Sequence, residues 1–223
     1  MSRKKREVEK VFKVFCEGDT ENNYFDYIRK HKKISLAIKP VNMHGGGYSN
    51  FLSQIKEDAN SNCLAKFIVI DGDRAVSIQG EKANLKKIIE YCKVQNESKR
   101  IPHILIIDFP DFEYVACLHI FNYKGQKVEQ FIKTELKYSD IEKFKSDQDV
   151  FSVLVERGKG SIDHLLGSIN AHTALIQNDI TVNKNKYEIQ VCTTVNEDNW
   201  GKRGTNFDDF YKLLLSVGVV VNT

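Results

Sequence analysis

Two acidic segments, each directly after an apolar run, hold the residues best suited to chemistry. Glu17 follows residues 14–16, and Asp71 and Asp73 follow residues 67–70. An apolar run that stops at a carboxylate predicts a buried parallel strand that delivers the acid to the carboxyl edge of a sheet. Carboxylates that converge there repel one another unless a cation neutralises them, and such oxygen ligands suit Mg²⁺ or Mn²⁺. The sequence therefore predicts a metal-dependent phosphoryl-transfer site at which Glu17, Asp71 and Asp73 converge.

Each of these acids also has a structural interpretation. Glu17, together with Asp19 and Glu21, complements the dipole of a helix that begins nearby. Asp71 and Asp73 are residue types that form turns and cap helices. In extended backbone, however, the two aspartates point to the same side at a Cα separation of roughly 6 to 7 Å, which brackets one metal ion. The functional interpretation depends on Glu17 and the aspartate pair lying together.

Four predicted strands must position these acids. They cover residues 11–16, 34–41, 66–70 and 103–107, and each is followed by a helical stretch. Strand and helix in alternation predict an α/β fold with a parallel four-stranded sheet flanked by helices. In the doubly wound order 2-1-3-4, the carboxyl ends of the first and third strands flank the crevice where ligands bind.

The helices between these strands have recognisable starts and faces. The first begins at Asp19 or Thr20, which can cap free backbone N–H groups, and the second opens after the glycines at 45–47. A third presents one apolar face to the sheet, because its apolar residues recur at helical spacing. Those residues are Leu85, Ile88, Ile89 and Cys92.

Beyond Pro110 the pattern changes to helices, predicted at residues 112–121, 128–136, 162–176 and 207–215. Residues 178–194 are polar and β-branched, and their pattern fits a hairpin and a loop equally well. We therefore divide the chain into a core domain of residues 1–120 and a mainly helical C-terminal extension of residues 121–223, packed on the core.

The acidic pattern resembles the Toprim domain, which has a Glu-Gly turn after its first strand and Asp-x-Asp after its third. More specifically, it resembles the RloB-like (AbiLii-type) proteins, whose opening motif is Glu-Gly-x-x-Thr-Glu-x-x-Tyr-Phe. The matching residues are Glu17, Gly18, Thr20, Glu21, Tyr24 and Phe25. A second family block is matched at Pro110, Phe112, Glu113 and His119. Phe109 and Val115 depart from the Asn and Trp of that block, and the likeness covers residues 11–120 best.

The resemblance implies a Toprim-like (Rossmann-like) fold and a Mg²⁺- or Mn²⁺-dependent nuclease that cleaves phosphodiester bonds. Asp71 and Asp73 would bind the metal, with Glu17 as a third ligand or general acid/base. Glu113 would add a ligand or orient one. The family implies a role in phage defence by abortive infection, often beside an ATPase partner. The substrate is left open between DNA and RNA, and the alternative is a non-catalytic module that binds nucleic acid or another subunit.

Composition sets broad limits. A net charge of +3 does not by itself indicate a nucleic-acid binder, although basic clusters at residues 3–6, 31–33, 86–87, 99–100 and 202–203 could line a phosphate backbone. Solvated helix faces explain most such clusters. The five cysteines form no Cys-x-x-Cys pair, and no apolar stretch reaches the roughly eighteen residues of a membrane span. We expect a cytoplasmic protein with no membrane partner, in which a homo-oligomer could span a duplex.

Overall fold

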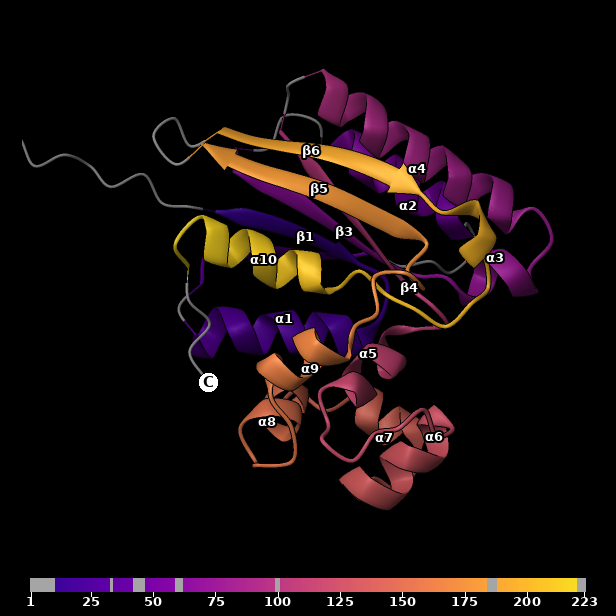
Figure 1. Cartoon of the computed structure of the whole chain (residues 1–223), viewed down its shortest axis with the longest axis vertical. Helices are drawn as coiled ribbons and strands as arrows, with labels where there is room; N and C mark the ends of the chain where they lie inside the picture. The colour runs from indigo at the N-terminus through magenta and orange to yellow at the C-terminus, as the bar shows by residue number, and fades with distance from the viewer. Residues whose placement is uncertain are drawn as a thin grey trace, which may run out of the picture.

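A computed structural model describes residues 11–32, 34–41, 47–58, 62–98, 101–183 and 188–219. Its centre is a parallel sheet of four strands in the order β2-β1-β3-β4, with helices on both faces (Figure 1). The α/β class and the strand order predicted from the sequence are therefore confirmed. No helix within the described ranges combines the length and the apolar character needed to cross a membrane.

The strands lie close to their predicted positions. They are β1 (Phe12–Cys16), β2 (Leu36–Pro40), β3 (Ala65–Asp71) and β4 (His103–Asp108). β3 and β4 are buried on both faces, as their unbroken apolar runs require. β1 pairs with β3 from Phe12↔Ala65 to Phe15↔Ile68. Asp71 pairs with Asp108 at the last position of the β3–β4 ladder.

One face of the sheet is covered by α1 (Asp19–His31) and α10 (Asp208–Ser216), as Figure 1 shows. Their buried side chains form a continuous apolar core with the underside of the sheet. Aromatic rings dominate the contact between the two helices. Phe25 of α1 stacks edge-on against Phe210 of α10 at 5.1 Å between ring centroids, and Phe210 in turn contacts Phe67 of β3.

The opposite face is covered by α2 (Gly47–Glu57) and α4 (Glu81–Glu97), with the short α3 (Asp73–Ser77) at the carboxyl end of β3. The apolar face predicted for the long helix is confirmed, because Leu85, Ile88, Ile89 and Cys92 are all buried. These residues join the upper side of the sheet in a second core. Of the predicted site residues, Glu17 directly follows β1, Asp71 ends β3, Asp73 begins α3 and Glu113 lies in the first turn of α5.

After β4 the chain forms short helices below the sheet edge (Figure 1). They are α5 (Phe112–Leu118), α6 (Val128–Phe131), a π-helical turn η1 (Ile132–Leu136), α7 (Ile141–Lys145), α8 (Val150–Val155) and α9 (Ile162–Ser168). The helix predicted at 112–121 ends earlier. The single helix predicted at 162–176 was wrong: Ile169 is already extended and Ile176 begins a strand. Its apolar spacing continues only because both segments face the interior.

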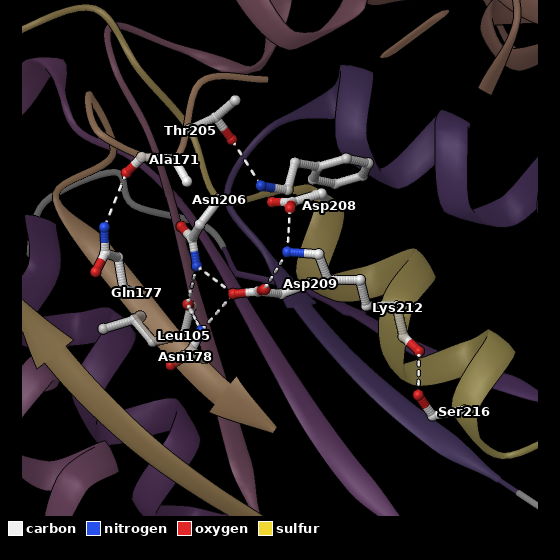
Figure 2. Close-up of polar contacts among 11 residues, drawn as sticks. Leu105, Ala171, Gln177, Asn178, Thr205, Asn206, Asp208, Asp209, Lys212 and Ser216 are labelled. Carbon is white, nitrogen blue, oxygen red and sulfur yellow. Dashed lines mark hydrogen bonds and ion pairs between the residues drawn. The ribbon is translucent and has the colours of Figure 1, made fainter. Parts of the chain in front are cut away.

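The undecided segment is a hairpin of β5 (Ile176–Asn183) and β6 (Glu188–Val195), so the C-terminal half is not entirely helical. It lies beside β4, whose outer edge would otherwise expose unpaired backbone groups. Asn206 covers that edge: its amide oxygen accepts from Ile107 N–H at 3.1 Å, and its Nδ2 donates to Leu105 O at 2.8 Å. Asn178 donates to the same carbonyl, and both amides donate to Asp209 (Figure 2).

The proposed division at residue 120 stays a prediction. α10 belongs to the C-terminal half yet packs on the sheet, so the apolar core draws on both sides of that division. Several basic residues and glycines singled out in the sequence lie outside the described residues. They are residues 3–6, Lys33, Gly45, Gly46, Lys99 and Arg100.

Candidate carboxylate site at the sheet edge

Glu17 occupies the first position after β1 and is held close to the end of β3. Burial, followed by the nearby charge of Asp73, raises the pKa of Glu17 to about 7. Arg74 and a hydrogen bond with the backbone of Asp71 act in the opposite direction. Its Oε2 is buried and has no hydrogen-bond partner among the described residues. Glu17 is thus an acid whose charge is only partly compensated.

Asp71 is the last residue of β3, and its carboxylate points toward the start of α5. Its Oδ1 accepts a hydrogen bond from the backbone N–H of Phe112 at 2.9 Å. Burial and then the charges of Glu21 and Glu17 raise the pKa of Asp71 well above its usual value. Asp73, two residues on, is the first residue of α3 and is exposed. The predicted neighbourhood of the first and third strand ends is therefore present.

Glu113 is the second residue of α5 and is buried, at 3% exposure. Its two oxygens already have partners: Thr20 Oγ1 donates to Oε1 at 2.5 Å, and Lys145 Nζ lies 3.3 Å from Oε2. Its charge contributes to the raised pKa values of Asp71 and Glu21. Glu113 therefore lies in the acidic group and links α1, α5 and α7.

Two further acids belong to this group and were not predicted as site residues. Glu21, 1% exposed, accepts a hydrogen bond from the Gly18 N–H at 3.2 Å, and burial followed by Glu113 raises its pKa to about 8. A Cβ on Gly18 would lie 2.6 Å from Glu21 Oε2, so glycine is needed for this close approach. In the sequence Glu21 resembles an acid that complements the start of a helix, and for that reason it was not predicted to belong to the site.

Asp108 is the second such acid and is fully buried at the end of β4. Thr205 donates a hydrogen bond to its Oδ1, whereas Oδ2 is without a hydrogen-bond partner in the described part of the chain. Burial raises the pKa of Asp108 to about 8. The signal that identified Asp71, an acid that ends a buried strand, applies equally to Asp108.

The chemistry of these side chains fits a divalent cation better than their present spacing does. Carboxylate oxygens with raised pKa values and unpartnered buried atoms are donors that a hard cation would stabilise. Within the described residues, however, no three His, Cys, Asp or Glu side chains lie close enough together to form a ligand group. The side chains of Glu17, Asp71 and Asp73 would have to lie closer together to hold a metal ion.

Comparison of the chain with models of protein families, with curated proteins and with solved structures gave no match. The resemblance to RloB-like and Toprim proteins therefore stays a prediction from the motif residues. The site must be judged on its own geometry.

Proposed function

We propose that this protein is a metal-dependent nuclease that hydrolyses phosphodiester bonds in DNA or RNA. The observation that carries the proposal is the group of buried and half-buried carboxyls around Asp71, near the carboxyl ends of β1, β3 and β4. Burial, followed by the charges of Glu21, Glu17, Glu113 and Asp108 in that order, raises the pKa of Asp71. Among the described residues, Glu113 is the one member of this group with an ion pair.

Such crowding lowers stability, because each buried carboxylate loses hydration and repels the others. A divalent cation would relieve this cost, and when bound it would neutralise phosphate oxygens and lower the pKa of an attacking water. Asp71 and Asp73 would hold it. Glu113, already tied to Thr20 and Lys145, would position the start of α5 beside them.

Glu17 has a second use in this proposal. A carboxyl with a pKa of about 7 accepts and releases a proton readily near neutral pH, as a general acid/base requires. We assign the proton transfer to Glu17 and treat ligation by the same residue as the alternative. Phage defence and an ATPase partner follow from the family resemblance alone, and a homo-oligomer follows only from the idea that paired subunits could span a duplex; all three are part of this proposal at that level.

The test is cleavage of defined nucleic acids by purified protein with Mg²⁺ or Mn²⁺. Circular single-stranded DNA, plasmid DNA and total cellular RNA would be incubated with wild type, Asp71→Asn and a matched control, Asp19→Asn. Asp19 is exposed on the same edge, in the first turn of α1. We expect Asp71→Asn to lower the cleavage rate by roughly 10³-fold, about 4 kcal/mol of barrier, and Asp19→Asn to leave it within about twofold.

Intact substrate in every wild-type reaction would refute the nuclease and favour the non-catalytic binding module. Equal cleavage by wild type and Asp71→Asn would place the activity elsewhere. Circular dichroism of each variant would show that the fold is retained, and sequencing the new ends would identify the preferred nucleic acid.

A further inference from the structure

A loop of residues 196–204 lies against the carboxyl end of β4 and carries the single tryptophan of the chain, Trp200. The loop is fixed by two backbone hydrogen bonds between Phe109 and Gly204, at 2.9 and 3.1 Å. The indole of Trp200 meets the Phe109 ring edge-on, with centroids 6.4 Å apart. The loop thus positions Trp200 directly beside the strand end that carries Asp108.

Phe109 also connects Trp200 to the aspartate pair. The Phe109 ring lies so close to Gly72 that a Cβ at that position would be 2.6 Å from it. Gly72 is the residue between Asp71 and Asp73. The Phe109 ring thus contacts both Trp200 and Gly72, the residue that joins the predicted metal ligands.

Two exposed lysines of α4 surround the indole. Lys82 Nζ lies 4.6 Å from the Trp200 ring centroid, and Lys86 Nζ lies 5.6 Å from it. Glu197 orients the group, because its Oε2 accepts from Trp200 Nε1 at 2.8 Å and lies 3.0 Å from Lys86 Nζ. Cation–π contacts at exposed sites contribute only about 0.5–1 kcal/mol, so stability alone gives little reason for this arrangement.

Apolar side chains continue the surface on the other side of the loop. Val76 is 60% exposed and Ile78 43% exposed, both unusually high for their type. A Cβ on Gly201 would lie 3.2 Å from Val76 Cγ1, so Val76 adjoins the loop that carries Trp200, and Ile78 lies two residues further along the chain. We define the Trp200 surface as Val76, Ile78, Lys82, Lys86 and Trp200.

We infer that the Trp200 surface binds single-stranded nucleic acid and guides it to the carboxylate site. A base would stack on the indole in the place that Lys82 Nζ now occupies, and the lysines would turn to the adjoining phosphates. An unpaired strand is favoured because its bases are free to stack on an aromatic ring. The inference rests on the proposed function for the class of ligand and adds the strand type and the residues that bind it.

The charge balance of the region agrees with a polyanionic ligand. Four basic side chains border the loop or lie on it, against two exposed acids, Glu197 and Asp198. The basic residues are Lys82, Lys86, Lys202 and Arg203. Arg203 is held in place by a hydrogen bond to Gly125 O at 3.0 Å and by its guanidinium over the Tyr114 ring. Two of the basic clusters noted in the sequence, at residues 86–87 and 202–203, therefore lie in the same region.

The single tryptophan makes the test direct, because all indole fluorescence comes from Trp200. Wild-type protein in EDTA would be titrated with 20-nucleotide oligothymidylate, oligouridylate and a DNA duplex of the same length. We expect saturable quenching by the single strands and at least about tenfold weaker binding of the duplex. The absence of divalent ions separates binding from cleavage.

Variants would be compared by the anisotropy of a labelled oligothymidylate. Lys82→Ala with Lys86→Ala should weaken binding at least tenfold and reduce its salt dependence by about two ions, and Trp200→Leu should weaken it by roughly tenfold. Trp200→Phe should retain most of the affinity. The matched control, Lys30→Ala with Lys133→Ala, removes two exposed lysines of α1 and η1 that also form ion pairs, and should remain within about twofold.

The outcomes separate the two ideas. Unchanged fluorescence and unchanged binding by the lysine pair variant, with wild-type cleavage intact, would overturn the Trp200 surface and leave the nuclease standing. Quenching of the wild type together with the expected loss of anisotropy-measured binding in the variants, with no cleavage under any metal, would support the surface and refute the nuclease. Equal or tighter binding of the duplex would overturn the assignment to single strands.

Discussion

The two ends of β3 carry opposite charges that are compensated to different degrees. At the amino end, Lys66 is fully buried, and its Nζ lies 2.6 Å from Asp58 O and 3.2 Å from Asp58 Oδ2. Asp58 Oδ1 also receives Lys13 at 2.5 Å and Lys39 at 2.9 Å. At the carboxyl end, Asp71 faces several carboxyls, and buried oxygens of Glu17 and Asp108 have no hydrogen-bond partner among the described residues.

The difference shows which cluster serves the fold. A buried lysine with a carboxylate and a carbonyl oxygen in reach has its charge satisfied, so the amino-end cluster holds β1, β2 and β3 to the end of α2. The carboxyl-end cluster lacks comparable compensation within the described residues and shifts its pKa values instead. We therefore expect the first cluster to govern stability and the second to govern activity.

The largest effect on stability should come from Asp58→Asn. The substitution leaves the Lys66 ammonium buried with no carboxylate, and breaking a buried pair on one side costs roughly 3–5 kcal/mol. Urea unfolding followed by circular dichroism would measure the change. Asp71→Asn is the matched test at the other end of the same strand and should cost less than about 1 kcal/mol, because it removes a repelled charge. A larger loss for Asp71→Asn than for Asp58→Asn would reverse the comparison.

The two ends should also respond oppositely to pH. Acids whose folded pKa is raised contribute stability that is complete below their unfolded value and is lost as pH rises through the folded value. For Glu17, Glu21 and Asp108 that loss extends from about pH 4 up to about 7 or 8. His103 at the amino end has its pKa lowered to about 4 by burial, so its contribution is lost as pH falls from about 6.5.

Urea unfolding in EDTA would therefore be measured between pH 7 and 8.5, above the pKa of the histidines in both the folded and the unfolded chain. We expect stability to fall by at least about 2 kcal/mol across this window, since one carboxyl contributes up to about 1.4 kcal/mol per pH unit. Glu21→Gln should flatten the profile. A flat wild-type profile would show that these carboxyls are not charged and crowded in the metal-free protein.

The contrast between the two clusters also shows what the sequence can predict. Long apolar runs define β3 and β4, and an acid directly after each strand locates Asp71 at the sheet edge. The position of Asp108 follows from the same signal, but only pairing in register with Asp71 shows that it belongs to the site. The sharing of Asp58 by three lysines could not be predicted, because it depends on where α2 ends relative to three strands.

The hairpin and the last helices illustrate a second limit. Residues 178–194 alternate polar and β-branched types, and their inward side chains pack against residues far away in sequence. Asn178 and Asn206 are polar in sequence, yet both bond to Leu105 O in the interior. Such long-range hydrogen bonds have no local periodicity, which is why the pattern left the hairpin undecided and extended α9 too far.

A divalent ion should stabilise the carboxyl end without any direct effect on the amino end. The test is made at pH 8, where the carboxyls ionise. A free Mn²⁺ concentration of about 100 times the dissociation constant would add about 2.7 kcal/mol to the free energy of unfolding. Thermal unfolding would detect this increase. At pH 5.5 protons compete for the same oxygens, so the effect should be much smaller. Asp71→Asn should abolish the shift, and Asp58→Asn should preserve it. An equal shift in Asp71→Asn would place the ion at another site.

The smallest effect should come from Lys39→Ala. This substitution tests how much each lysine of the amino-end cluster contributes to stability. Lys39 is 49% exposed, whereas Lys66 is fully buried and Lys13 is 13% exposed, although all three share Asp58. Exposed ion pairs contribute at most about 1 kcal/mol, so Lys39→Ala should cost less than that, while Lys66→Ala should cost several times more. If both substitutions lowered the free energy of unfolding equally, the three ammonium groups would act as one network. The stability of the amino end would then depend on its total charge and not on the buried Lys66 alone.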